Sequence, residues 1–209
     1  MYNFENENKF FYYLNHQRAS KIFAQIEIFL KTKKIDGDIV EFGVFKGNSL
    51  NRLILLRDFY AKNKKVYAFD TFKIIKTDKK DLDNQQYRKF IKESKNYQLS
   101  LKEIKKSLKR KKMHKNVKLI KGDVRETLIK TFKKKTKLSF VLLDLDLYEP
   151  SAYVLKNIWR KLQKKAIILL DNYKVFKGET KAVNEFVKKN NLKIHNLKLH
   201  RNFYYLQKS

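Results

Sequence analysis

The sequence predicts an α/β protein with a doubly wound, mostly parallel sheet of about seven strands, the last of them antiparallel. Three observations lead to this fold class. Strand-like and helix-like segments alternate from residue 38 onward. The runs 139–145 and 166–170 are almost wholly apolar, as expected of central parallel strands covered on both faces. The last two strand-like runs are joined by too few residues for a parallel crossover.

The first half of the sheet begins with a short apolar run that ends at a glycine. Residues 38–42 predict the first strand, which leads into Gly43. Residues 49–60 follow with the apolar spacing of a helix. The next predicted elements are strands at 66–70 and 117–120 and a helix over 151–162, with Pro150 in its first turn, where a missing N–H group is harmless.

The last third of the chain predicts a helix followed by a hairpin. The helix covers 179–189, and the strands cover 192–199 and 202–206. Their connection around His200-Arg201 is so short that the last strand must run antiparallel to its neighbour. A further helix, at about 16–33, precedes the sheet.

We expect residues 1–209 to form one domain, because this length suits a single hydrophobic core. The highly charged segment 71–115 has little strand character and predicts helices at about 84–95 and 99–111. It follows the carboxyl end of the second strand, where α/β proteins place lids and substrate contacts. The segment is therefore either a lid over the site or a solvated helical insertion.

The formal net charge of +29 is the most conspicuous property of the composition. Only eight of the 50 basic residues are arginine, and lysines are scattered through every predicted helix and loop. Nucleic-acid sites favour arginine forks and exposed aromatic side chains. We therefore favour a compositional bias toward lysine and keep a polyanionic partner as the second interpretation.

Several classes of protein are excluded or disfavoured. The chain has no cysteine, which excludes disulfides, thiolate metal sites and cysteine nucleophiles. No apolar run approaches the roughly 18 residues that span a bilayer. The polar, acidic residues 1–7 differ from a secretory signal. We expect a soluble cytoplasmic protein.

A glycine-containing turn links the first strand to its helix. It includes Glu41, Gly43, Gly47 and Ser49 in the pattern E-x-G-x-x-x-G-x-S. The glycines permit a tight turn and let a ligand approach backbone N–H groups at the helix start. Asp70 closes the second strand, where a carboxylate can accept hydrogen bonds from both ribose hydroxyls. Such a turn alone is as often structural, but together with Asp70 it favours an adenosine site.

Acidic and amide side chains follow two other predicted strands. Asp144 and Asp146 follow the fourth strand, and Asp171 and Asn172 follow the fifth. Adjacent strand ends lie about 5 Å apart, so one ion can be shared by both loops. Mg²⁺ prefers carboxylate and amide oxygens. The alternative is that these residues cap a helix and form a turn.

These segments together resemble the macrocin O-methyltransferase family of class I methyltransferases, over about residues 35 to 190. The matching segments are EFGVFKGNS (41–49), FDTF (69–72), KGD (121–123) followed by Thr127-Leu128, LDLDLYE (143–149) and DNY (171–173). The resemblance implies a Rossmann-like fold, S-adenosylmethionine as cofactor, Mg²⁺, and a sugar hydroxyl as acceptor. Two departures are Asn172, where the family usually has a second Asp, and Gln163-Lys164-Lys165, where it usually has a Gly-Gly turn.

The resemblance also implies roles for individual residues. The cofactor residues are Glu41, Gly43, Gly47 and Ser49 around the methionine portion, Asp70 at the ribose, and Gly122 and Asp123 near the adenine. Asp146, Asp171 and Asn172 would bind Mg²⁺, with Asp144 beside them as a cofactor contact or an alternative ligand. Asp146 would also take the acceptor proton, and Tyr148, Glu149 and Tyr173 would contact the acceptor or simply cover the core edge.

Two other functions stay open. The net charge suggests a nucleic-acid methyltransferase. Methylation of a base at its C5 carbon usually needs a cysteine, which this chain lacks. The enzymes that methylate amino groups of bases carry a pair of prolines, whereas Pro150 is the only proline here. Ribose methylation of RNA is not affected by these absences. A non-catalytic binding protein is suggested by Asn172 and the missing glycines. The sequence is compatible with a homo-oligomer.

Overall fold

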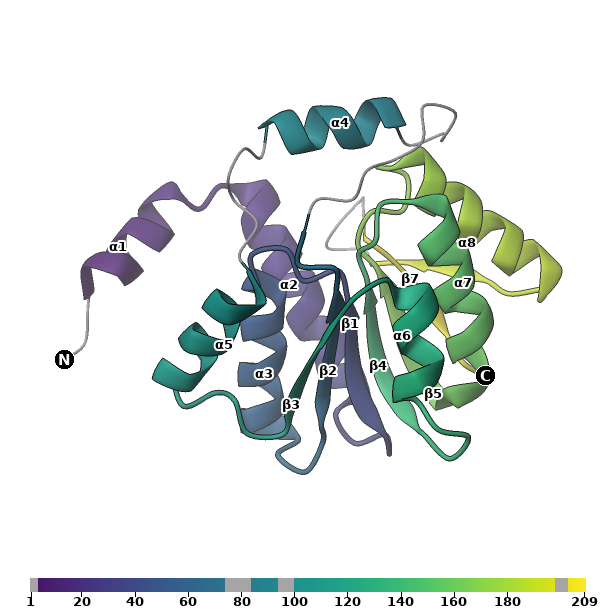
Figure 1. The fold of residues 1–209 in the computed structure, drawn as a ribbon, viewed down its shortest axis with the longest axis horizontal. Helices are drawn as coiled ribbons and strands as arrows, with labels where there is room; N and C mark the ends of the chain where they lie inside the picture. The colour runs from purple at the N-terminus through teal and green to yellow at the C-terminus, as the bar shows by residue number, and fades with distance from the viewer. Residues whose placement is uncertain (1–3, 74–83, 94–99, 198–202) are drawn as a thin grey trace.

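The computed structural model describes residues 4–73, 84–93, 100–197 and 203–209. Its centre is a seven-stranded sheet in the order β3-β2-β1-β4-β5-β7-β6 with helices on both faces, as the sequence predicts (Figure 1). The strands are β1 (Asp38–Phe42), β2 (Val66–Asp70), β3 (Val117–Lys121), β4 (Leu138–Leu143), β5 (Leu162–Leu170), β6 (Ile194–Asn196) and β7 (Tyr204–Gln207).

The first five strands are parallel, and β7 runs antiparallel to both β5 and β6. This confirms the prediction of an antiparallel last strand. The turn expected around His200-Arg201 lies outside the described residues. The strand order reverses between β1 and β4, and open α/β sheets bind ligands at the carboxyl ends of strands at such a point.

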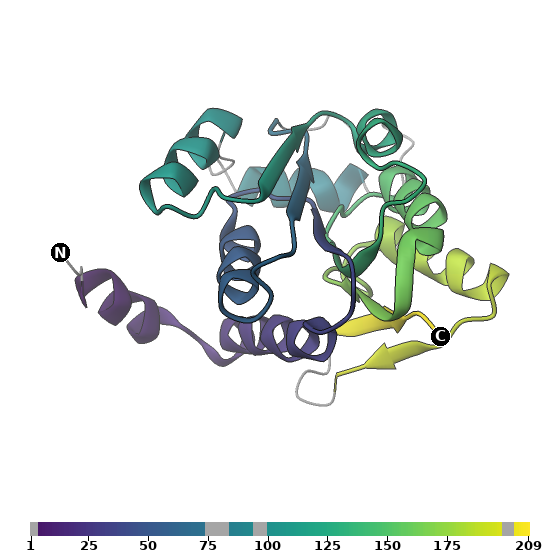
Figure 2. The ribbon, with the colours of Figure 1, turned by 90° about the horizontal axis from the view of Figure 1, so that it is seen from below.

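Two groups of helices cover the two faces of the sheet (Figure 1). On one face lie α2 (His16–Thr32), α3 (Asn48–Tyr60) and α5 (Leu101–Arg110), and on the other α6 (Val124–Thr131), α7 (Tyr148–Ile158) and α8 (Lys177–Lys189). The two remaining α-helices of the described chain are α4 (Asn84–Glu93), which crosses above the sheet, and α1 (Phe4–Tyr13), which projects away from the body (Figures 1 and 2).

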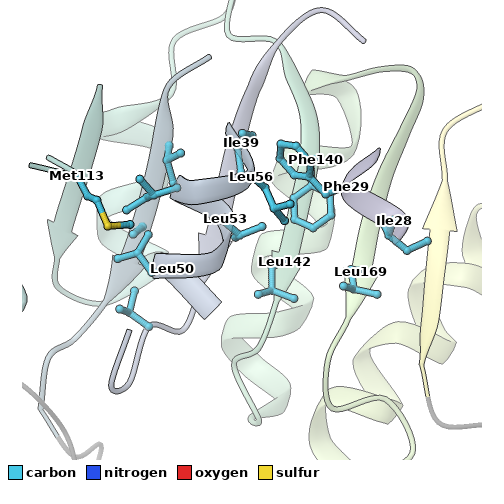
Figure 3. Close-up of a cluster of buried hydrophobic side chains, with 14 of the residues drawn as sticks. Ile28, Phe29, Ile39, Leu50, Leu53, Leu56, Met113, Phe140, Leu142 and Leu169 are labelled. Atoms are coloured by element: carbon cyan, nitrogen blue, oxygen red, sulfur yellow. The ribbon is translucent and has the colours of Figure 1, made fainter. Parts of the chain in front are cut away.

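The sheet separates two hydrophobic cores. Successive side chains of a strand point to opposite faces. Phe140 of β4 therefore packs with the α2–α3 core, where its ring lies 5.9 Å from that of Phe29, and Val141 belongs to the core under α7. Figure 3 shows the first of these clusters, with Leu53 of α3 and Leu142 of β4 in the same layer. Burial on both faces explains the near-continuous apolar runs.

The structure differs from the sequence prediction in a few elements. Helix α1 has no buried residue, so it lacks the apolar stripe from which a helix is predicted. Helix α6 has only eight residues, too few for a clear periodic pattern. Strand β4 ends at Leu143, which puts Asp144 and Asp146 in a loop. Lys165 adopts a positive φ of 65° inside β5, the backbone conformation that the expected glycine turn would otherwise supply.

Candidate functional site

Two loops meet at the carboxyl edge of the sheet, one after β1 and one after β4. Gly43 of the first loop has a φ of 91°, and a Cβ atom there would stand 1.8 Å from the carbonyl oxygen of Asp144 in the second. Asp144 N donates to the carbonyl of Phe42 at 2.9 Å. The glycine loop and the acidic loop therefore form one continuous site, and only glycine fits between them.

Asp70 holds the glycine loop in shape. Its Oδ2 accepts hydrogen bonds from the N–H groups of Val44 (2.7 Å) and Phe45 (3.0 Å). Its Oδ1 accepts from the N–H of Phe72 at 2.6 Å. The loop ends at Gly47, whose φ of 76° begins α3. The predicted pairing of Asp70 with the glycine turn is thus a direct contact in the structure.

Glu41 lies fully buried beneath this loop. Ser49 Oγ donates to its Oε1, while Oε2 has no hydrogen-bond partner among the described residues. Burial raises the pKa of Glu41 to about 8. Arg52 is close enough for its charge to favour the ionised carboxylate. Glu41 and Ser49 therefore support the loop from below.

Gly122 and Asp123 follow β3 at the same edge. The N–H of Gly122 donates to the carbonyl of Asp70 at 3.0 Å. Asp123 caps α6 by accepting from the N–H of Arg125 at 2.8 Å, and it also forms an ion pair with that side chain at 2.6 Å. The hydrogen bond from Arg125 lowers the pKa of Asp123. The structure thus gives Asp123 a capping role, beside which an adenine contact remains a prediction.

The four side chains predicted after β4 and β5 come together. Asn172 Nδ2 lies 2.5 Å from Oδ1 of Asp144 and 2.5 Å from Oδ1 of Asp146. Asp146 has a positive φ of 63°, which is uncommon for a residue other than glycine. Asp171 is buried, and one of its oxygens, Oδ1, has no hydrogen-bond partner in the described part of the chain.

Glu179 is a residue of this site that the sequence analysis missed. It lies in the first turn of α8 and is fully buried. Its carboxylate accepts hydrogen bonds from the N–H groups of Leu145 (3.1 Å), Asp146 (3.2 Å) and Asn172 (3.2 Å). It therefore joins the loop after β4 to the loop after β5. Burial, and next the charge of Asp146, raise its pKa to about 8. An acidic residue in the first turn is common at any helix start, so no distinct signal marks Glu179 in the sequence.

Lys21 is the second residue that the sequence analysis missed. It extends from α2, and its Nζ forms an ion pair with Oδ2 of Asp171. Burial disfavours its charge, but Asp171 and then Asp144 outweigh burial and raise the pKa of Lys21. Burial and the charge of Asp171 raise the pKa of Asp144 well above its usual range, while Lys21 opposes this. The two partners lie 150 residues apart, beyond any local pattern.

The predicted acceptor residues lie on this side of the molecule with different degrees of exposure. Tyr148 is half-buried, and its hydroxyl donates to Glu185 of α8 at 2.6 Å. Glu149 is exposed. Tyr173 is 7% exposed, and its hydroxyl donates to Asn184 at 2.8 Å. Tyr173 packs at the edge of the core, and a contact with the acceptor remains a prediction.

Helix α4 covers the carboxyl edge by aromatic contacts. Phe90 of α4 lies 5.6 Å from Phe45 of the glycine loop and 6.2 Å from Phe176 at the start of α8, measured between ring centroids. Figure 1 shows the helix crossing above the sheet between these two regions. This placement suits the lid interpretation of the segment 71–115.

The loops after β4 and β5, together called the acidic loops, carry the types of oxygen donor that a hard divalent cation prefers. They offer carboxylates and an amide whose oxygen can be presented by rotation, and Asp171 has an oxygen without a partner among the described residues. In the described part of the chain, however, no three His, Asp or Glu side chains stand ready to hold a metal. Lys21 and the amide of Asn172 already contact the carboxylates, so an ion would compete with these donors.

A lysine-lined cavity of about 750 Å³ lies at the opposite edge of the sheet. Its walls include Asp38 and Lys65, at the starts of β1 and β2, and Lys137, just before β4. This concentration of positive charge is therefore remote from the glycine loop. Within the described residues, no helix combines the length and the apolar character needed to span a bilayer.

The comparison with known proteins agrees with this site. The macrocin O-methyltransferase (TylF) family model matches residues 14–207. The chain is similar in structure to the calicheamicin methyltransferase CalS11 (22% identity, 99% of this chain and 86% of that chain, TM-score 0.74). It is similar also to the O-methyltransferase NovP (21%, 92% and 80%, TM-score 0.76) and to an rRNA methylase from Streptococcus thermophilus (16%, 93% and 98%, TM-score 0.55).

At these identities the structural likeness establishes the fold, and the family model carries the activity. No curated protein matches the sequence. The family match extends from the start of α2 to the last strand, so it includes both loops of the site. The chain therefore belongs to the macrocin O-methyltransferase family and is an S-adenosylmethionine-dependent O-methyltransferase.

Proposed function

We propose that this enzyme methylates a hydroxyl group of a sugar or another small polyol at the carboxyl edge of β1 and β4. The observation that carries the proposal is the contact of Gly43 with Asp144, which joins the adenosine-type loop to the acidic loops. The structural likeness to CalS11, described as a TDP-rhamnose 3'-O-methyltransferase, supports a sugar acceptor (24% identity, TM-score 0.70).

The cofactor would lie along the glycine loop. Gly43 leaves room for the backbone of Asp144, and Gly47 turns the chain into α3. Glu41 and Ser49 brace the loop from below. Asp70 would turn part of its carboxylate from the loop N–H groups toward the ribose hydroxyls. Gly122 and Asp123, at the neighbouring strand end, would border the adenine.

The acceptor would lie over the acidic loops, between the glycine loop and α8. Methyl transfer is an in-line displacement, so the acceptor oxygen has to be aligned with the sulfonium methyl group. The C–O bond forms as the C–S bond breaks, and S-adenosylhomocysteine leaves. Asp146 would take the hydroxyl proton, and Glu179 fixes the loop that carries Asp146. Tyr148 and Glu149 would border the acceptor.

The residues that would hold Mg²⁺ are Asp146, Asp171 and Asn172, with Asp144 beside them. When bound, the ion would make the acceptor hydroxyl more acidic and fix its position. The carboxylates of Asp144 and Asp146 both contact the side-chain amide of Asn172, and this proximity of oxygen donors supports a cation here. The ion would share Asp171 with Lys21, which forms an ion pair with the other oxygen of that carboxylate.

Calorimetric titration with S-adenosylhomocysteine tests the cofactor site. We expect binding by the wild type, and at least about tenfold weaker binding by Asp70→Asn, because hydrogen bonds to a charged group are worth about 1.5–3 kcal/mol. Asp58→Asn, on the outer side of α3, is the matched control and should bind as the wild type does. Absence of binding at millimolar ligand would contradict the proposal.

Transfer of a labelled methyl group tests the acceptor class. We expect label in TDP-rhamnose or a related sugar nucleotide, and loss of that transfer in Asp146→Asn. Glu126→Gln, in the first turn of α6, is a control for the loss of one carboxylate. Labelling of RNA in place of sugars would show the nucleic-acid alternative to be right.

A further inference from the structure

Lys21 brings a positive charge of the chain itself into the acidic loops. Its Nζ contacts Asp171 directly, and the side chain is 25% exposed while that of Asp171 is 1% exposed. The charge of Lys21 also acts on Asp144, on the neighbouring loop. A buried carboxylate without a cation or hydrogen-bond donors is costly. Lys21 therefore supplies the charge balance that these carboxylates need.

Lys21 contacts only one of the two carboxylate oxygens of Asp171. Oδ1 is buried and has no hydrogen-bond partner in the described part of the chain. Buried polar atoms in proteins nearly always have partners, so an exception of this kind points to a ligand at that position. Asp171 thus has one oxygen bound to the ammonium group and one buried oxygen that no described residue satisfies.

We propose that Lys21 is a built-in cation that holds the acidic loops together in the metal-free enzyme and competes with a divalent cation for Asp171. This inference rests on the proposed function, because it concerns the same site. An ammonium group and a divalent ion on one carboxylate repel each other at low effective dielectric. The positive charge of Lys21 beside Asp171 therefore lowers the affinity of the site for Mg²⁺.

The consequence is an enzyme whose site keeps its form without Mg²⁺. The loops would remain folded at low Mg²⁺ concentration, since Lys21 and Asn172 bind their carboxylates. Lys21 is a positioning residue in this arrangement, because it acts on the loop and on a bound cation through Asp171. Its effect is best measured as metal affinity and as stability, since these quantities do not depend on turnover.

Titration calorimetry with MgCl₂ tests the competition. Lys21→Met keeps the aliphatic stem and removes the charge, and we expect it to bind Mg²⁺ roughly tenfold more tightly than the wild type, equivalent to 1.4 kcal/mol. Lys21→Arg keeps the charge and should bind as weakly as the wild type. Lys31→Met is the matched control, since Lys31 lies on the same helix and pairs with Glu27 at the surface. Equal or weaker Mg²⁺ binding by Lys21→Met would overturn the proposal.

Thermal unfolding in EDTA and in MgCl₂ supplies a second readout. We expect Lys21→Met to have the lower melting temperature in EDTA and to recover most of the loss with MgCl₂, but not with NaCl of equal ionic strength. The wild type and Lys31→Met should change little. If Lys21→Met folds only with Mg²⁺, the proposal is supported, and if Mg²⁺ does not restore it, the proposal fails.

S-adenosylhomocysteine binding by the wild type, measured in the same preparations, separates the role of Lys21 from the proposed function. Binding of this ligand combined with an unchanged Mg²⁺ response in Lys21→Met would reject the role of Lys21 alone. Absence of ligand binding would instead reject the proposed function.

Discussion

Gly43 and Asp144 touch through their backbones: a Cβ atom at Gly43 would stand 1.8 Å from the carbonyl oxygen of Asp144. This contact joins the first and fourth strands where the sheet order reverses. The acidic loop can take up its position only if residue 43 is a glycine. This requirement is separate from any contact that the glycine loop makes with a cofactor.

Gly43→Ala should therefore prevent folding or lower the free energy of unfolding by more than about 4 kcal/mol, an exceptional loss for one methyl group. Gly47→Ala is the matched control. Its φ of 76° is strained for alanine, but the nearest atoms to an added Cβ lie 3.7 Å and 4.0 Å away. We expect it to lose only about 1–2 kcal/mol. Urea unfolding of both variants distinguishes a steric requirement from a purely conformational one, and equal losses would contradict this account.

Glu179 should be the acid on which the two acidic loops most depend. Glu179→Ala removes the acceptor for three backbone N–H groups, and we expect a loss of about 3–5 kcal/mol in the free energy of unfolding. Glu179→Gln keeps an acceptor oxygen and should lose less. Glu185→Ala, on the exposed part of the same helix, should lose under about 1 kcal/mol. A Glu179→Ala variant as stable as Glu185→Ala would show that the two loops keep their structure without the hydrogen bonds to Glu179.

Stability should fall between about pH 4.5 and pH 8 because of Glu41. Its pKa is raised to about 8 in the folded chain from an ordinary value of 4.5. The folded chain therefore keeps a proton that the unfolded chain has released, so the contribution is fully present below pH 4.5 and is lost as the pH rises through 8. At about 1.36 kcal/mol per pKa unit, the loss is on the order of 5 kcal/mol at most.

Glu41→Gln keeps a hydrogen-bond acceptor for Ser49 and cannot ionise. Urea unfolding at pH 5, 6, 7 and 8 should show a shallower decline for this variant than for the wild type. Some decline should remain, because Glu179 has a similarly raised pKa. Glu27→Gln, at a surface position of α2, should reproduce the wild-type slope. Parallel curves for Glu41→Gln and the wild type would contradict the burial of a protonated Glu41.

Phe90 should couple α4 to the cofactor loop. Phe90→Ala removes ring contacts with Phe45 and Phe176, each worth about 0.5–1.5 kcal/mol. We expect roughly tenfold weaker binding of S-adenosylhomocysteine, with little change in melting temperature. Phe59→Ala, whose side chain is 77% exposed on α3, is the control. If both variants bind the ligand as the wild type does, α4 is a solvated insertion and no lid.

The sequence by itself determined the strands, their mostly parallel direction and the antiparallel end. These follow from local properties: apolar runs for strands buried on both faces, helical spacing between them, and a connection too short for a crossover. It also located Asp70, Asp144, Asp146, Asp171 and Asn172 at strand ends, and parallel strands bring such ends to one edge. Helix α1 was not predicted because it has no buried residue, and α6 was not predicted because it is short.

Only the tertiary structure decided which groups stabilise that edge. Lys21 and Asp171 meet across 150 residues, and Glu179 reaches two loops from a helix start that looks ordinary in sequence. Whether Tyr173 faces an acceptor or the core likewise depends on its partner Asn184. The physical reason is that charge balance and burial are properties of the assembled site. A sequence pattern specifies which residues end the strands, whereas packing specifies which distant charges lie beside them.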